Sequence, residues 1–181
     1  MPQQPIDIRP IAGALGAEIF GVDLACELSD DIIKAIRQAL LNHLVIFFRD
    51  QDIEPVHQIA FAERFGNLVE YPLVKGLDGF PEIVPVVKLP HERANFGGLW
   101  HSDTTYLNLP PMGTILAARE LPPYGGNTLF ANMYKAYETL SEGMRGMLNG
   151  MVAISSSAKS RVSKTRENLM KTSSKVSDST E

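Results

Sequence analysis

The sequence has little of what several large classes of protein require. Cys26 is its only cysteine, which excludes a disulfide within the chain. With no other Cys or His close to it in sequence, Cys26 is interpreted as a buried structural thiol. The longest apolar run, 44–48, is far shorter than the roughly 20 residues that cross a bilayer, and residues 1–20 contain no basic segment followed by an apolar one. We therefore expect a cytoplasmic protein with no membrane partner.

Positive charge is not in excess either. The chain has 17 Lys and Arg against 21 Asp and Glu, which gives a formal net charge of −4. Binding to a phosphate backbone needs a broad electropositive surface, so nucleic acid is not an expected partner. What is present is ordinary globular composition: 181 residues, 44% of them hydrophobic, suffice for one domain with a sizeable core.

The N-terminal part combines strand and helix signals. Short apolar stretches alternate with glycines in residues 6–24, which favours a hairpin or edge strand. Ser29 is expected to cap a helix over 30–42, in which apolar residues recur at helical spacing. The apolar run 44–48 then predicts a short, fully buried strand.

A second helix is expected to have Pro55 in its first turn and to end near Gly66. Beyond it, strand-like segments alternate with Pro- and Gly-rich turns, a pattern typical of a β-barrel or jelly roll. A third helix is predicted over 133–149. The predicted strands cover residues 82–88, 100–106, 114–119 and 128–132.

The most distinctive local feature is the sequence His101-Ser102-Asp103. In an extended strand, residues two apart face the same side, so both outer side chains could reach one metal ion. Imidazole and carboxylate are ligands of the two-His, one-carboxylate site, which leaves positions on iron(II) open for a cosubstrate and oxygen. The spacing alone also fits a plain surface pair on a strand. The third ligand must come from elsewhere, and His43, His57 and His91 are poor candidates for it.

Gly125-Gly126-Asn127-Thr128 is predicted to be a turn, because it lacks the Gly-Lys-Ser/Thr ending of a phosphate loop. Thr128 begins the strand that follows. Its hydroxyl is either a donor to a carboxylate inside a barrel or simply solvated.

A series of short motifs follows along the chain: Gly16–Ile19, Gly21–Leu24, Val45–Gln51, Phe65-Gly66, Trp100–Asp103, Pro110-Pro111 and Gly125–Thr128. In this order they resemble the taurine dioxygenase family, which includes chlorophenoxyacetate dioxygenases and alkylsulfatases. The resemblance spans about residues 6–153, and the ordered series is far more specific than any single motif.

The resemblance implies a mixed, mainly β fold, a double-stranded β-helix (jelly roll) with flanking helices. It is expected to be incomplete here because the C-terminal half is absent. Residues 1–153 would be the N-terminal part of a dioxygenase domain, and 154–181 a polar, mobile lid segment at which the chain is cut off.

The resemblance also implies a reaction that uses Fe(II), 2-oxoglutarate and O2. His101 and Asp103 would bind the iron, and Thr128 would hydrogen-bond the 2-oxoglutarate carboxylate. The family's distal His and its carboxylate-binding Arg lie in the missing half. The chain alone is therefore expected to bind iron weakly and to be inactive.

The implied substrate is a small, anionic organic molecule: a sulfonate, a sulfate ester or an aryloxy acid. Taurine dioxygenase has a sulfonate-binding His shortly after Phe-Gly, where this chain has Tyr71, a donor of one hydrogen bond. Glu70 would disfavour an anion if it faced the pocket, so taurine itself is disfavoured. Asn95 is a second candidate substrate contact.

A rival hypothesis is a truncated, non-catalytic binding or interaction protein of the same fold. Half a jelly roll leaves an open sheet edge, which could pair with another chain. Assembly into a homo-oligomer is also left open by the sequence.

Overall fold

The computed structural model describes residues 6–71, 74–89, 91 and 97–156. The chain divides into two compact units, residues 1–96 with 112–149 and residues 97–111 with 150–181. Within the described part of the chain, every helix and strand belongs to the first unit. The polar segment 154–181 that was expected to be a lid lies outside the described residues except for 154–156.

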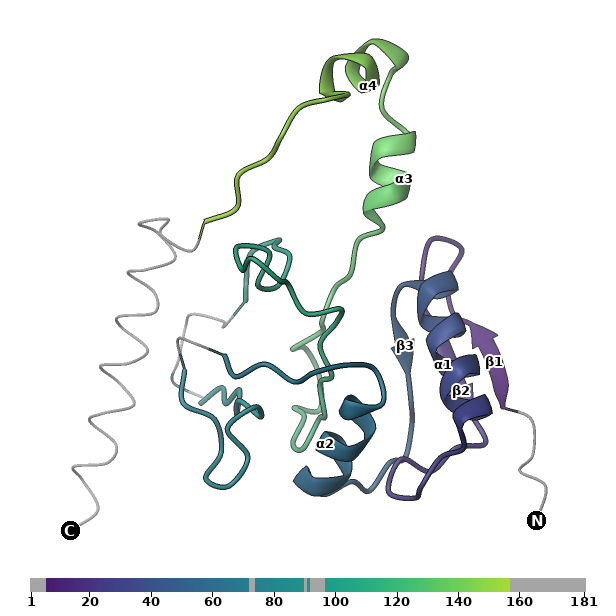
Figure 1. The fold of residues 1–181 in the computed structure, drawn as a ribbon, viewed down its shortest axis with the longest axis vertical. Coiled ribbons are helices and arrows are strands. Elements are labelled where there is room, and N and C mark those ends of the chain that lie inside the picture. The colour runs from purple at the N-terminus through teal and green to yellow at the C-terminus, as the bar shows by residue number, and fades with distance from the viewer. Residues whose placement is uncertain (1–5, 72–73, 90, 92–96, 157–181) are drawn as a thin grey trace. The chain divides into compact units, whose positions relative to one another are not determined.

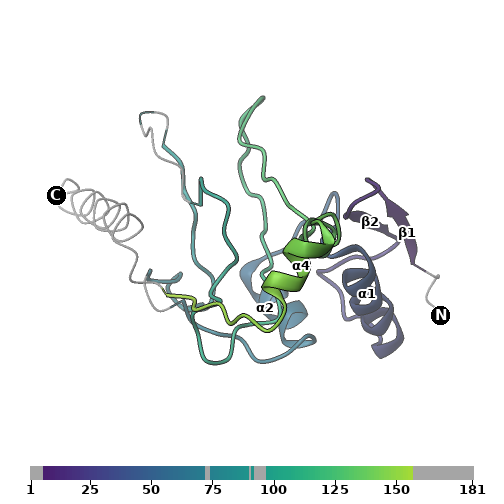
Figure 2. The ribbon, with the colours of Figure 1, turned by 90° about the horizontal axis from the view of Figure 1, so that it is seen from above.

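The first unit is organised around a three-stranded mixed sheet in the order β1-β2-β3. Strands β1 (Asp7–Pro10) and β2 (Ala17–Phe20) form the predicted antiparallel hairpin. Strand β3 (Ile46–Phe47) runs parallel to β2, and α1 (Asp30–His43) lies between them in sequence, as a parallel crossover requires. Figure 1 shows α1 alongside the strands, and Figure 2 shows it against one side of β1 and β2.

Helix α1 confirms the prediction for residues 30–42 because its local signals agree. The Ser29 Oγ accepts a hydrogen bond from the Ile32 amide at 3.4 Å, and acidic residues fill the first turn, where the helix dipole favours them. The helix ends at Leu44, which adopts a left-handed conformation (φ 67°) and donates its amide to the Leu40 carbonyl at 2.7 Å.

The core of the first unit lies between α1, the sheet and α2 (Pro55–Glu63). Ile36 exposes none of its surface, and Phe61 packs edge-on against Phe48 and Phe65 with ring centroids 5.8 and 5.1 Å apart. Each such side chain contributes roughly 1.5–3 kcal/mol on burial. The buried members are Ile19, Leu24, Leu28, Ile32, Ile33, Ile36, Ala39, Ile53 and Phe61.

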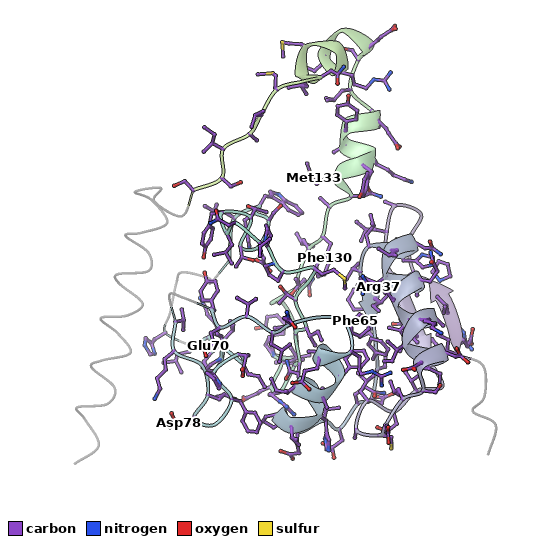
Figure 3. The ribbon with its side chains drawn as sticks, in the orientation of Figure 1. Arg37, Phe65, Glu70, Asp78, Phe130 and Met133 are labelled. Carbon is purple, nitrogen blue, oxygen red and sulfur yellow. The ribbon has the colours of Figure 1, made fainter. Side chains whose placement is uncertain are left out.

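Three hydrogen bonds tie the end of α2 to the α1 region, one of them from Arg64 Nη2 to Asp30 Oδ1 at 2.5 Å. Arg64 Nη1 donates to the Leu28 carbonyl at 2.8 Å. Arg37 Nη1 donates to the Phe65 carbonyl at 3.4 Å, and Figure 3 shows these two residues side by side. Pro55 occupies the first turn of α2, as predicted.

Several sequence predictions are wrong. The strand at 44–48 shortens to two half-buried residues. None of 82–88, 100–106, 114–119 and 128–132 forms a strand. A strand needs a neighbouring backbone to accept and donate its hydrogen bonds, and no described residue supplies a ladder to these segments.

Two of these segments nevertheless contact β3 and α2. The Phe130 ring meets Phe47 edge-on with centroids 6.2 Å apart, and Gln58 Nε2 donates to the Ile115 carbonyl at 3.3 Å. Among the described residues from 97 to 156, however, none is buried. Phe61 is therefore the last buried core residue among those described, and half-buried Phe65 and Ala117 pack against the core.

The helix predicted over 133–149 is two helices, α3 (Met133–Glu138) and α4 (Glu142–Leu148). Ser141 ends their continuity because its Oγ accepts from the Met144 amide and so caps a new helix at 3.2 Å. At the start of α3, Asn132 Nδ2 donates to the Ala14 carbonyl at 2.6 Å and Lys135 Nζ to the Gly13 carbonyl at 2.8 Å.

Cys26 is exposed, which corrects the prediction of a buried thiol. It lies in the loop before α1, where its amide donates to the Asp23 carbonyl at 3.2 Å in a turn that faces solvent. Its Sγ donates to Asp23 Oδ2 at 3.3 Å. No helix in the described part of the chain is long and apolar enough to cross a membrane.

Candidate metal centre

The two predicted ligands belong to the second unit, where Asp103 begins a turn and His101 lies two residues before it. Residues 103–106 form the turn, with the Leu107 amide donating to the Thr104 carbonyl at 3.0 Å. Thr104 has φ 49°, a left-handed conformation that is unfavourable for a β-branched residue. Backbone strain of this kind gathers at functional sites in proteins. The His101 and Asp103 side chains, which a strand was expected to align, meet directly before this turn.

The His101 ring has a defined tautomer. Its Nδ1 lies 2.6 Å from the Leu99 carbonyl oxygen, which can only accept, so Nδ1 carries the hydrogen. In the neutral ring, Nε2 then holds a lone pair. That nitrogen lies 3.1 Å from Asp103 Oδ1.

Two acceptor atoms at this distance repel each other unless a positive charge lies between them or beside both. A proton on Nε2 meets that need, and so does a metal ion bound by Nε2 and Oδ1. Two ligands bound at right angles, each about 2.1 Å from a metal ion, are separated by about 3 Å. The observed separation and the ligand types therefore fit two adjacent positions on one ion.

The pair does not form a complete site by itself. The His101 and Asp103 side chains are 51% and 56% exposed, so water reaches both. Among the described residues, no third His, Cys, Asp or Glu joins them to form a cluster of three. His57 has another role, since its Nδ1 accepts the Glu54 amide at 3.1 Å at the start of α2.

Two hydroxyls on the same turn are also distinctive. Thr104 Oγ1 and Tyr106 Oη are shielded from solvent and have no hydrogen-bond partner in the described part of the chain. A buried hydroxyl without a partner costs stability. Both lie within three residues of Asp103 in sequence.

Tyr71 lies in the first unit and lines a cavity of about 580 Å³. Glu70 and Asp78 line the same cavity, and Figure 3 shows where both stand. Lys75 Nζ binds Asp78 Oδ1 at 2.7 Å. This contact lowers the pKa of Asp78 and raises the pKa of Lys75; the hydrogen bond is the larger cause and the attraction between the two charges the smaller one. Glu70 and Asp78 bring two negative charges to the lining of this cavity, against one positive charge from Lys75.

Two further predicted site residues are Thr128 and Asn95. Thr128 belongs to the first unit, is exposed and follows Gly125 and Gly126, which both have positive φ, as a tight turn requires. Asn95 lies outside the described residues. Sequence reasoning missed the Leu99 carbonyl, which contacts the His101 ring, and Gly97, where an added Cβ would meet that ring. The paired glycines shortly before the motif were the available signal.

The sequence matches a family model described as taurine catabolism dioxygenase TauD, TfdA family, over residues 7–180. The alpha-ketoglutarate-dependent sulfate ester dioxygenase of Pseudomonas putida is 36% identical over 152 residues, which cover 83% of this chain and 50% of that protein. The chain spans about half the length of the curated relatives it matches.

Solved structures agree with this similarity. A taurine dioxygenase from Burkholderia xenovorans matches with a TM-score of 0.68 and 36% identity, covering 80% of this chain and 51% of that one. A second structure, AAD-2 in complex with Mn(II) and N-oxalylglycine, matches with a TM-score of 0.58 and 28% identity, covering 80% and 49%.

Proposed function

The chain belongs to the taurine catabolism dioxygenase TauD, TfdA family, and we propose that it is the N-terminal part of an Fe(II)- and 2-oxoglutarate-dependent dioxygenase in which His101 and Asp103 are two of three metal ligands. The observation that carries this proposal is the 3.1 Å separation of Nε2 and Oδ1, with Nδ1 held by the Leu99 carbonyl. Residues 1–153 would form this part of a jelly-roll domain, and 154–181 a polar lid segment.

The chain's own residues have distinct tasks in this proposal. The Leu99 carbonyl keeps the His101 ring in the tautomer whose Nε2 can bind a metal. Asp103 adds a negative charge beside it. When bound together, Fe(II), 2-oxoglutarate and O2 would supply the oxidation of an unactivated C–H bond, with release of CO2 and succinate.

The cosubstrate and metal assignments have support from the relatives. The Pseudomonas putida relative is named alpha-ketoglutarate-dependent, and AAD-2 was crystallised with Mn(II) and N-oxalylglycine. N-oxalylglycine is 2-oxoglutarate with an NH in place of one CH2. We propose that Thr128 donates its hydroxyl hydrogen to a 2-oxoglutarate carboxylate.

The proposed substrate is a small organic anion: a sulfate ester, a sulfonate or an aryloxy acid. Tyr71 lines a cavity and would donate one hydrogen bond to the anionic group, and Asn95 is proposed as a second contact. Glu70 lines the same cavity and repels an anion. The anionic group would therefore have to approach Tyr71 on the side away from Glu70.

The coding region beyond Glu181 gives the first test. A reading frame that encodes a later His and, about a dozen residues on, an Arg would complete the metal and cosubstrate sites. The protein from that frame is then incubated with Fe(II), 2-oxoglutarate and each of the three substrate classes, and succinate is measured. Substrate-dependent succinate formation that disappears in His101→Ala is the expected result.

A stop codon directly after Glu181 would favour the rival, a non-catalytic binding protein of the same fold. Absence of succinate with all three classes, together with unchanged metal affinity in His101→Ala, would contradict the enzyme proposal.

A further inference from the structure

Gly97 lies against the edge of the His101 ring that bears the proposed metal ligand. Its φ is +70°, in the left-handed region that favours glycine. A Cβ at this position would lie 3.2 Å from His101 Cε1 and 3.7 Å from Nε2. Carbon atoms prefer separations of about 3.5–4.0 Å, so an added side chain would press on the ring.

The His101 side chain is 51% exposed, and two polar contacts hold its ring in place. On one side, Nδ1 donates to the Leu99 carbonyl at 2.6 Å, and on the other, Nε2 faces Asp103 Oδ1 at 3.1 Å. If the ring rotated to relieve contact with a Cβ at position 97, the Nδ1–H bond to the Leu99 carbonyl would lengthen. The same rotation would turn Nε2 away from Asp103 Oδ1.

We infer that Gly97 is a positioning residue for the metal site: the missing side chain lets the His101 ring keep its Nδ1–H bond to Leu99 while Nε2 faces Asp103. The inference rests on the proposed function. It adds a specific reason for glycine at this position, separate from the φ angle.

The matched control for the φ angle is Gly150. It lies in the same unit and has φ +81°, but a Cβ there would meet no atom of the described residues within 4 Å. Gly97→Ala and Gly150→Ala therefore both place alanine in an unfavourable left-handed conformation. Only Gly97→Ala also brings a methyl group against the His101 ring. Gly97→Asn is a second variant, because Asn tolerates left-handed backbone better than Ala and still brings a Cβ.

The first measurement uses the metal-free 181-residue chain. Long-range ¹⁵N–¹H NMR reports the tautomer of His101, and the chain has only four histidines to assign. The wild type and Gly150→Ala should keep the hydrogen on Nδ1, with or without a second proton on Nε2, and Gly97→Ala and Gly97→Asn should lose it in part. The same Nδ1 occupancy in all four proteins would overturn the inference.

The second measurement is Mn(II) binding, followed by electron paramagnetic resonance of the free ion. Gly97→Ala and Gly97→Asn should bind about tenfold more weakly than Gly150→Ala, within the range found when groups that orient a metal ligand are changed. Equal affinities would overturn the inference. If the wild type binds no Mn(II) through His101, the proposed function fails, while the tautomer measurement still decides the role of Gly97.

Discussion

His101 Nε2 and Asp103 Oδ1 lie 3.1 Å apart although the two residues do not share a strand. Asp103 begins a turn whose second residue, Thr104, is left-handed, and the Leu99 carbonyl fixes which ring nitrogen of His101 is available. Two acceptors so arranged need a cation. The pair is therefore better prepared for a metal ion than its spacing in the sequence indicates.

Replacing Asp103 by Asn tests this electrostatic argument. The Asn side chain can place an N–H where the carboxylate was, so it can donate to the His101 Nε2 lone pair without any cation. We expect Asp103→Asn to leave the free energy of unfolding unchanged or slightly higher, and to weaken Mn(II) binding about tenfold or more. Urea denaturation and Mn(II) titration measure the two effects. Unaltered Mn(II) affinity would speak against the carboxylate as a ligand.

The core should respond to truncation according to burial. Ile36 is fully buried in α1, whereas Leu41 on the same helix is 58% exposed. Ile36→Ala is expected to lower the free energy of unfolding by about 2–5 kcal/mol. Leu41→Ala should change it by about 0.5 kcal/mol or less. Urea denaturation of both variants measures the difference, and similar losses would show that α1 does not pack as described.

Helix α1 also shows where sequence was sufficient. The Ser29 cap and the spacing of Ile32, Ile33, Ile36 and Ala39 lie within one short segment, so local residues determine the helix. The Pro55 start of α2 was predictable for the same reason. Residues 114–119 and 128–132 have strand-like sequences and form no strand, because a strand depends on a backbone partner that its own residues do not encode.

The site was predictable in composition and not in geometry. His101 and Asp103 could be named from their residue types and the ordered motifs. A turn through Thr104 could not, since β-branched residues disfavour positive φ. The apolar spacing continues past Ser141 and therefore predicts one helix. Ser is a common helix cap, and here it begins a second helix instead.

Cys26 should react slowly with alkylating reagents. The hydrogen bond to Asp23 and the charge of that carboxylate both raise the pKa of the thiol, which lowers the fraction of reactive thiolate at neutral pH. Asp23→Asn removes the charge and keeps an oxygen for the Ala25 amide, which Asp23 Oδ1 accepts at 2.9 Å. We expect iodoacetamide to label this variant several-fold faster. Equal rates would show that Asp23 does not control the thiol.

The Lys75–Asp78 pair predicts a pH window. Asp78 has its pKa lowered by Lys75, so its contribution is present above the ordinary carboxyl pKa and is lost as pH falls through the lowered value. Lys75 has its pKa raised, so its contribution is lost as pH rises through the raised value. In an NMR titration, Lys75→Met should return the Asp78 pKa toward its ordinary range, whereas Lys34→Met should leave it unchanged. A normal Asp78 titration in the wild type would refute the pairing.

The most direct test of the central claim is to locate a bound metal ion. Small amounts of Mn(II) are added to the ¹⁵N-labelled 181-residue chain, and the paramagnetic broadening of each amide signal is recorded. We predict broadening centred on residues 101–103 that is lost in His101→Ala, with the spectrum of the α1 core unchanged. Broadening centred elsewhere, or the same broadening in His101→Ala, would contradict the assignment of His101 and Asp103 as metal ligands.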